Sequence, residues 1–344
     1  MRSGVRVIGA AVAALAVAGS LVACSSDDSS DGGGDADLVV YTGRSEEQIG
    51  DLIAQFEDEQ SVTVDVRYGD TAELAVQLLE EGDASPAEVF WAQDAGALSA
   101  VDEAGLFVDL PKKALAMVPE EYQALDGRWI GTSGRARVYT YNPTTVPQSE
   151  LPSSVFELTE SEWADRVAIA PTNGSFQAFV TAMRESAGDD VTEQWLTDLK
   201  NNGAVAYESN TLILDAVDAG EIDLGLINHY YWFQKASELG EDAVTAQIDF
   251  FEEGDPGSLV NVSGAGVLTT GEDNALATEF VEFLLTPEAQ EYFVEVAKEY
   301  PLIKGVAPQE GLPSLDSLEG PDIELYQLAD LEGTLEMLTE TGWI

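Results

Sequence analysis

Two adjacent phenols, Tyr230 and Tyr231, are the side chains of this 344-residue sequence whose type and spacing most directly indicate chemistry. They lie in the segment LINHYYWF beside His229, the only histidine of the chain. Adjacent residues of an extended chain point to opposite faces, so at least one phenol should leave the core. A hard trivalent cation favours oxygen ligands and lowers the phenol pKa, which is ordinarily about 10. The pair therefore indicates either a hard-metal site or aromatic residues packed in a core.

Two predicted strand-to-helix loops could hold an anion. The loop YTGRSEE places Arg44 and Ser45 before a helix, and PTNGSF places Asn173, Gly174 and Ser175 before another. Free N–H groups and the positive end of the helix dipole make such a helix start an anion site. In the alternative reading, Ser45 begins a capping box and Ser175 or Asn173 caps the second helix.

The motifs of the common hydrolases and phosphate-transferring enzymes do not occur in the sequence. It has no G-x-S-x-G, H-E-x-x-H or G-x-x-x-x-G-K pattern, and its only cysteine is Cys24. The sequence therefore predicts a protein that is not an enzyme. A secreted hydrolase that uses paired carboxylates is the remaining enzymatic alternative.

The charge of the chain is strongly negative. It carries 64 acidic and 15 basic residues, for a formal net charge of −49. Such a chain has no basic stripe for nucleic acid, and its field attracts cations and repels free anions. The same acidity also suits a solvated surface in a salty medium. Against this background, Arg44, Arg135 and Arg137 lie in or beside the predicted cleft segments, which favours an anion-binding role for them.

The first residues indicate export. Arg2 and Arg6 precede an apolar run, 7–22, that is too short for a comfortable membrane span. The following LVAC resembles the lipobox of bacterial lipoproteins, so we expect a signal peptide at 1–23 and lipidation of Cys24. The polar, glycine-rich stretch 24–37 then predicts a flexible linker. The protein is thus expected on the outer face of the cytoplasmic membrane, held by its lipid anchor alone.

Strands and helices alternate along the rest of the chain. Predicted strands at 38–41, 62–68 and 87–91 are each followed by an amphipathic helix, and Asp70 should cap the second of these helices. A second set of such units begins near Trp129. This alternation predicts an α/β fold with a parallel sheet.

About 300 residues suffice for two lobes, and the chain should cross between them. We expect one lobe from 38–137 plus 262–312 and the other from 138–261 plus 313–344. Hinges are expected near 137–141 and 260–264, with ligand loops at the carboxyl ends of the strands that face the cleft.

A series of segments resembles a known family. They are LVVYTGRSEEQIGDLIAQFE, VRYGDTAEL, GDASPAEVFWAQDAGAL, GRWIGTSGRARVYTYN, APTNGSFQAFVTA, INHYYW, DPGSLVNVSGAGVL and EYPL, in this order. Together they resemble the ferric-ion-binding lipoproteins and periplasmic proteins of bacterial ABC iron importers, over nearly all of 38–313. The resemblance implies a two-lobed, type II periplasmic-binding-protein fold with mixed, mainly parallel sheets. It also implies a monomer that captures Fe(III) with phosphate or carbonate and passes it to ABC transporter permease subunits.

The resemblance also implies roles for individual residues. A vicinal tyrosine pair binds Fe(III) as phenolates in this family and matches Tyr230 and Tyr231. A turn at a helix start holds the synergistic anion, with help from two asparagines. The matching positions here are Asn173, Gly174, Ser175, Asn210 and Asn228. His229 would be a neighbour of the metal and not a ligand.

The first-lobe side of the site departs from the family pattern. Some members add a histidine and a glutamate, whose positions here are Ser45 and Gln93, neither a strong ligand for Fe(III). Other members bind with tyrosines and anion only, which suits Arg44 as the partner of the anion. Glu46, Tyr68 and Asp94 lie close enough in sequence to contribute, and the choice among them stays open.

A rival interpretation keeps the same fold with a different ligand. In it, Arg44, Arg135 and Asn173 bind an anionic or organic solute. Tyr230 and Tyr231 are then structural.

Overall fold

The computed structural model describes residues 36–344. The expected signal peptide at 1–23, the lipidation site Cys24 and nearly all of the linker at 24–37 lie outside the described residues. From residue 36 onward, no helix is both long and apolar enough to span a membrane.

The strands alternate with helices in the first part of the chain, as their hydrophobic pattern predicts. The strands are β1 Leu38–Thr42, β2 Val64–Tyr68, β3 Val89–Ala92, β4 Trp129–Tyr141, β5 Val167–Ile169, β6 Val205–Ala206, β7 Leu224–Asn228, β8 Gln247–Asp249, β9 Val260–Val267 and β10 Tyr300–Pro301. The α-helices are α1 Glu46–Gln60, α2 Thr71–Glu81, α3 Ala95–Glu103, α4 Lys112–Leu115, α5 Gly174–Ala187, α6 Asp189–Asn201, α7 Asn210–Asp218, α8 His229–Leu239, α9 Ala275–Phe283, α10 Pro287–Tyr292 and α11 Leu331–Glu340.

The strand order is β2-β1-β3-β9-β4-β7-β5-β6, with β10 and β8 each paired to β4. β1 lies parallel to β2 and β3, and β5 lies parallel to β6 and β7, whereas β4 and β9 run antiparallel to their neighbours. The sheet is therefore mixed, with parallel strands at both ends.

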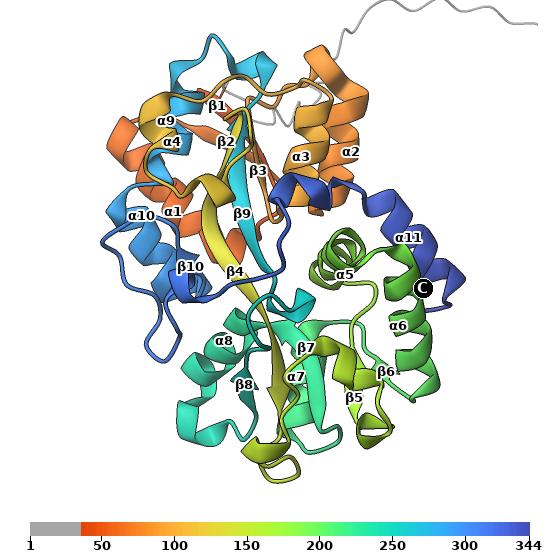
Figure 1. The fold of residues 1–344 in the computed structure, drawn as a ribbon. Coiled ribbons are helices and arrows are strands. Elements are labelled where there is room, and N and C mark those ends of the chain that lie inside the picture. The colour runs from red at the N-terminus through yellow and green to blue at the C-terminus, as the bar shows by residue number, and fades with distance from the viewer. Residues whose placement is uncertain (1–35) are drawn as a thin grey trace, which may run out of the picture. The chain divides into compact units, whose positions relative to one another are not determined.

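Strand β4 joins two lobes. Its first half pairs with β9 and β10, and its second half pairs with β7 and β8. Figure 1 shows β4 running from the upper lobe into the lower one, beside the end of β9. The register pairs Ala136 with Val260 at the last β4–β9 step, and Arg137 with Asn228 at the first β4–β7 step. The crossing point thus lies close to Ala136 and Val260.

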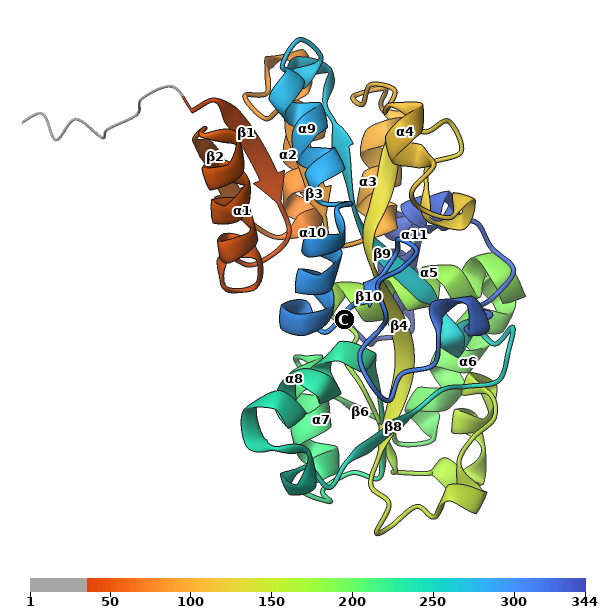
Figure 2. The same cartoon turned by 90° about the vertical axis from the view of Figure 1, so that its left-hand side faces the viewer.

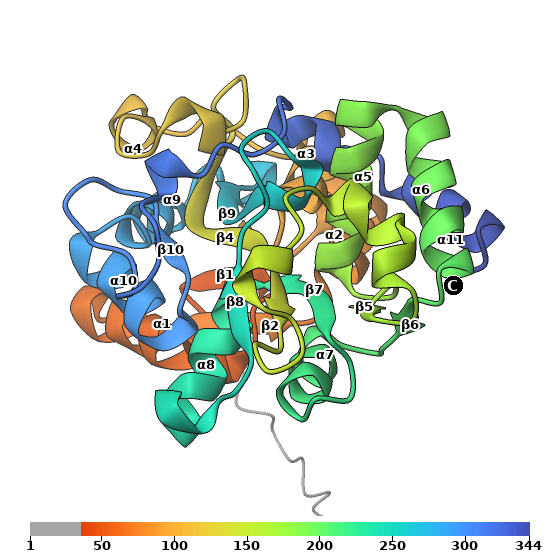
Figure 3. The same cartoon turned by 60° about the horizontal axis from the view of Figure 1, so that its bottom comes forward.

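Helices cover both sides of each lobe. In the first lobe, α1 and α9 lie on one side of the strands and α2 and α3 on the other (Figures 1 and 2). In the second, α7 and α8 lie on one side and α5 and α6 on the other (Figure 3). The longer helices bury an apolar stripe, as α1 does with Ile49, Leu52 and Phe56.

The C-terminal segment contacts both lobes. A 3-10 helix, Leu325–Ala329, packs on α3, where the backbone oxygen of Leu328 would lie 2.5 Å from a Cβ at Gly96. The next helix, α11, packs on α5, where Thr334 Oγ1 lies 2.7 Å from Thr181 Oγ1. The end of the chain therefore bridges the two lobes along one flank.

Candidate functional site

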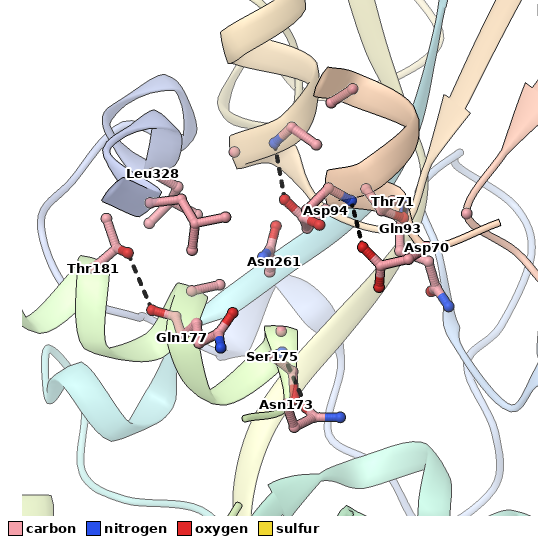
Figure 4. A pocket seen from close by; sticks show the side chains of 18 of the residues that line it. Asp70, Thr71, Gln93, Asp94, Asn173, Ser175, Gln177, Thr181, Asn261 and Leu328 are labelled. Atoms are coloured by element: carbon pink, nitrogen blue, oxygen red, sulfur yellow. Dashed lines mark hydrogen bonds between the residues drawn. The ribbon is translucent and has the colours of Figure 1, made fainter. Parts of the chain in front are cut away.

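A cavity of about 1260 Å³ lies between the two lobes. The ends of β1 and β3, the first turns of α2, α3, α5 and α8, and the crossing strands β4 and β9 all contribute to its lining. Figure 4 shows Asp70, Gln93 and Asp94 on its first-lobe side, facing Asn173 and Ser175 of the second lobe. The carboxyl ends of parallel strands meet here, as expected for ligand sites of α/β proteins.

The tyrosine pair lies on the second-lobe wall. Tyr230 and Tyr231 both line the cavity, with ring centroids 4.3 Å apart and an interplanar angle of 31°. The strand ends at Asn228 and α8 begins at His229, so the pair occupies the first turn of a helix and not a strand. The extended geometry assumed for this pair was therefore wrong, because neighbours on a helix can share one wall. The expectation that at least one phenol leaves the core holds, since both line the cavity.

Burial makes the Tyr230 phenol hard to ionise. Desolvation raises the pKa of Tyr230, and the neighbouring Tyr231 raises it further. The guanidinium of Arg135 opposes both effects. Without a cation in the cleft, Tyr230 thus stays protonated at neutral pH, and a bound cation would have to displace its proton.

Two arginines of β4 flank the phenols. Arg135 and Arg137 are two residues apart, so both side chains point to the cavity face of the strand. Arg135 Nη1 donates to Gln93 Oε1 at 3.0 Å and thereby links the crossing strand to the first-lobe wall.

The second of these arginines is held by the other lobe. Arg137 Nη1 donates to Ser175 Oγ at 3.2 Å, and its guanidinium lies over the rings of Phe176 and Phe179. Burial lowers the pKa of Arg137 to about 9, so it is still charged at neutral pH. Its Nε, like that of Arg135, is buried without a hydrogen-bond partner.

The turn before α5 forms the polar floor of the cavity. Asn173 Oδ1 accepts hydrogen bonds from Ser175 N at 3.0 Å and from Ser175 Oγ at 2.5 Å. Asn210 lies behind this turn, and its Nδ2 donates to Asn173 Oδ1 and to Ser175 Oγ, each at 3.1 Å. Gly174 and Asn228 line the cavity, and a Cβ at Gly174 would meet open space. The structure thus brings together all five residues of the predicted anion turn.

The first-lobe wall is built around Thr71 and Asp94. Thr71 Oγ1 accepts a hydrogen bond from Gln93 N at 3.2 Å and lies so close to Gly43 that a Cβ there would be 1.6 Å away. Asp94 caps α3 by accepting from Ala97 N at 2.9 Å. Desolvation raises the pKa of Asp94, and both this hydrogen bond and the charge of Arg135 oppose that rise.

Three residues expected near the ligand lie elsewhere. Arg44 is fully buried behind the wall, where its Nη1 donates to both carboxylate oxygens of Glu299 at 3.0 and 2.8 Å. Ser45 is exposed at the start of α1 and makes no side-chain cap, and Tyr68 ends β2; neither lines the cavity. The Arg44 guanidinium is paired with Glu299, a carboxylate distant in sequence. The residue pattern of a single loop cannot indicate such a partner.

His229 lies behind the tyrosine pair and is fully buried. Its Nδ1 accepts a hydrogen bond from the backbone N–H of Ala136 at 3.2 Å, which ties α8 to the crossing strand. Burial lowers the pKa of His229 to about 4, although the carboxylate of Glu299 opposes this effect. The imidazole is therefore neutral at physiological pH.

Similarity to known proteins extends over most of the chain. Residues 84–317 match the family described as bacterial extracellular solute-binding protein. The chain is 35% identical over 309 residues to the Fe(3+)-binding periplasmic protein of Serratia marcescens, which covers 90% of this chain and 91% of the relative. It is 32% identical over 309 residues to the major ferric iron-binding protein of Neisseria meningitidis, covering 89% and 93%.

Solved structures of iron-binding proteins also resemble the structure of this chain. Iron-bound HitA from Pseudomonas aeruginosa superposes with a TM-score of 0.83 at 34% identity, covering 89% of this chain and 99% of that one. The Trichodesmium protein IdiA (FutA), in complex with iron and citrate ligands, superposes with a TM-score of 0.79 at 27% identity and the same coverage. The predicted two-lobed α/β fold and the predicted resemblance to ferric-ion-binding proteins are both confirmed.

Proposed function

This chain belongs to the bacterial extracellular solute-binding proteins, which are binding proteins and not enzymes, and we propose that it captures ferric ion together with a small anion. The observation that carries the proposal is the pair of phenols, Tyr230 and Tyr231, side by side on one wall of the cleft. Relatives named for ferric-ion binding cover about nine-tenths of the chain, which supports the same cargo here.

The chemistry of the wall suits a hard cation. Within 36–344, no three His, Cys, Asp or Glu side chains are grouped to hold a metal ion, so the phenol oxygens are the donors we propose. Fe(III) prefers such oxygen donors and stabilises phenolate over phenol. Tyr230 and Tyr231 would then each lose a proton to the solvent when the ion binds.

We assign the anion to the side chains around the turn before α5. Arg137 Nη1 donates to Ser175 Oγ, and the positive end of the α5 dipole lies at the same turn. Asn173 and Asn228 line the cavity, and Asn210 fixes the turn from behind. Phosphate or carbonate would fit these donors, and its negative charge would offset the two buried guanidinium groups nearby.

In our proposal, Arg135 and Arg137 replace Arg44 as the cationic partners of the anion. Arg44 is already neutralised by Glu299, whereas Arg135 lines the cavity. Gln93 and Asp94 are the first-lobe side chains placed to meet the ligand when the lobes close. Closure would occur by rotation about the crossing at Ala136 and Val260, between lobes built from 38–137 plus 262–312 and from 138–261 plus 313–344.

We further infer that the protein works outside the cell, anchored by a lipid on Cys24, and delivers its iron to an ABC transporter permease. The lipobox-like LVAC and the family membership support this part of the proposal. Mass spectrometry of the membrane-extracted protein would test it, since an acyl mass on Cys24 is expected and an unmodified terminus elsewhere would contradict it.

An anionic organic solute is the second candidate ligand. The cavity of about 1260 Å³ exceeds the space that one ion and one small anion need, and two buried arginines line it. In that case Tyr230 and Tyr231 would only pack against the solute.

Visible absorption distinguishes the two. Soluble protein that begins at Ser25 would be stripped of metal and titrated with ferric citrate. A tyrosinate-to-iron charge-transfer band that saturates at one equivalent, and that is lost in Tyr230→Phe/Tyr231→Phe, is expected. Tyr141→Phe is the matched control, because Tyr141 lies on β4 outside the cavity lining. No band in a protein whose circular dichroism is unchanged would refute ferric capture by the phenols.

A further inference from the structure

The outer part of the cleft has apolar walls that the proposed function leaves unused. Val76 and Leu79 of α2 are 55% and 44% exposed, and both line the cavity. Leu331 and Leu335 of α11 line the same cavity and are half-buried. None of the four packs into a hydrophobic core cluster of the described chain. They line the part of the cavity formed by α2 and α11, whereas the tyrosine pair lies on α8 and the predicted anion turn precedes α5.

The two walls are fixed to different lobes, although the 3-10 helix Leu325–Ala329, which precedes α11, also packs on α3 of the first lobe. α2 is fixed to the first lobe by its opposite face, where Leu74 and Leu78 are 3% and 1% exposed in the core. α11 is fixed to α5 of the second lobe by the buried pair of Thr181 and Thr334 hydroxyls. The ion pair of Arg184 with Asp330, at 2.9 Å, adds to this attachment. A rotation about the β4–β9 crossing would therefore change the distance between the walls.

From this arrangement we propose that Val76 and Leu79 dock onto Leu331 and Leu335 when the lobes close. We call these four residues the latch. The latch rests on the proposed function, because closure over the ferric ion brings the walls together. It determines how much of the protein is closed, and hence how slowly iron leaves, without contributing a ligand.

Negative charge on the same walls opposes closure, and apolar contact would offset it. Glu332 and Glu336 of α11 line the cavity and are exposed, in a chain whose net charge is −49. Closing a strongly negative first lobe onto these carboxylates is opposed by like-charge repulsion. Apolar contact offsets that repulsion, since burying exposed apolar surface is favourable whatever the net charge. Exposed apolar residues on α2 and half-buried ones on α11 are thus expected if closure needs them.

The size of the effect follows from the exposed fractions. About half of one valine and one leucine side chain would be removed from water on docking. This burial favours the closed form on the order of tenfold to a hundredfold. Val76→Ser/Leu79→Ser should therefore release iron faster by a similar factor, measured by transfer to a competing chelator. The charge-transfer band itself should keep its position, because the tyrosines are untouched.

A matched control isolates the cleft from general surface effects. Leu212 on α7 is 44% exposed, as Leu79 is, and lies outside the cavity lining. Leu212→Ser should leave the release rate unchanged. An unchanged rate in Val76→Ser/Leu79→Ser would overturn the latch. The latch would also be overturned if Val76→Ser/Leu79→Ser released iron faster only when it was presented with an organic chelator, and not with inorganic phosphate. The walls would then hold the chelator.

A disulfide trap tests the contact directly. Cys24 is the only cysteine, so soluble protein that begins at Ser25 is cysteine-free. Leu79→Cys/Leu335→Cys can form a disulfide only when the two Cα atoms come within about 7 Å. Ferric loading should speed this cross-link, whereas the control pair Leu79→Cys/Leu212→Cys should not respond.

The trap also separates the latch from the proposed function. A normal charge-transfer band with a cross-linking rate that iron does not change would overturn the latch alone. Absence of the band would refute ferric capture. The latch would then be supported only if Leu79→Cys/Leu335→Cys still cross-linked faster than the control pair in metal-free protein, and overturned if it did not.

Discussion

The buried ion pair behind the site predicts the largest single effect on stability. Arg44 Nη1 lies 2.8 Å from Glu299 Oε2, and the two side chains are 0% and 1% exposed. Ser133 Oγ donates to the same oxygen at 2.6 Å. Glu299→Gln keeps the shape of the side chain but leaves the Arg44 guanidinium buried without a counter-charge. Breaking a buried pair in this way costs about 3–5 kcal/mol of the free energy of unfolding.

Urea unfolding of the soluble protein measures this cost, and a surface pair supplies the control. Lys113 Nζ lies 3.3 Å from Glu282 Oε2, but the lysine side chain is 79% exposed. Glu282→Gln should therefore cost less than about 1 kcal/mol. A cost for Glu299→Gln that is no larger than this would refute the view that Glu299 neutralises Arg44.

The same pair predicts a dependence on pH. Burial works against ionisation of Glu299, but Arg44, Arg135 and the Ser133 hydrogen bond prevail and lower its pKa below the ordinary value. A carboxylate whose folded pKa is lowered contributes stability above its unfolded pKa and loses it as the pH falls through the folded value. The difference in stability between wild type and Glu299→Gln should therefore shrink on acidification below the ordinary glutamate range. A difference that grew would contradict the assignment.

Ferric binding should release up to two protons, because burial raises the pKa of Tyr230 and phenolate is the form that binds the ion. A pH-stat should count one proton fewer per bound ion in Tyr231→Phe than in wild type. Equal proton counts in the two proteins would contradict phenolate ligation. Arg137→Gln should weaken iron binding more at low phosphate concentration than at high, since excess anion offsets the lost contact with the guanidinium. An equal loss of iron affinity at both phosphate concentrations would place the anion elsewhere. His229 has its pKa lowered to about 4 by burial, so stability is fully present above its unfolded pKa and is lost as the pH falls through about 4. In urea unfolding at a series of pH values, His229→Gln should lose about 3 kcal/mol less of its free energy of unfolding on acidification than wild type does. Curves of unfolding free energy against pH that run parallel for the two proteins would contradict this prediction.

Much of the fold could be predicted because its signals are local. Asp70 caps α2 through Ala72 N and Glu73 N, and Gly82 ends that helix, as the sequence pattern indicates. The alternation of buried strands with amphipathic helices likewise predicts the two-lobed α/β fold. The capping box expected at Ser45 fails, because Ser45 starts α1 without a side-chain hydrogen bond.

The site was predicted only as far as its residues are neighbours in sequence. The turn with Asn173 and Ser175 and the pair Tyr230 and Tyr231 are such neighbours, and the structure places all of them on the cavity. Arg44 was placed by the same reasoning, but its partner Glu299 is 255 residues away and reaches it only in the folded protein. No local pattern signals a contact of that kind.

The position of the 3-10 helix Leu325–Ala329 is the other feature that the sequence does not reveal. Gln327 Nε2 donates to Glu185 Oε2 at 3.1 Å, while Leu328 lies against α3, so the segment is fixed by two partners at once. Sequence periodicity reports one buried face and cannot report a bridge between lobes.

The two arginines of β4 show why an anion belongs to the proposed site. Arg135 and Arg137 are 6% and 2% exposed, and neither forms an ion pair within residues 36–344. Burying unpaired charges costs several kcal/mol each, so the metal-free cleft is held at the expense of stability. A cation bound by phenolates alone would add positive charge to this excess, whereas a dianion bound beside Arg137 would offset it. Iron and anion should therefore bind together more tightly than either alone, because each neutralises the charge that opposes the other.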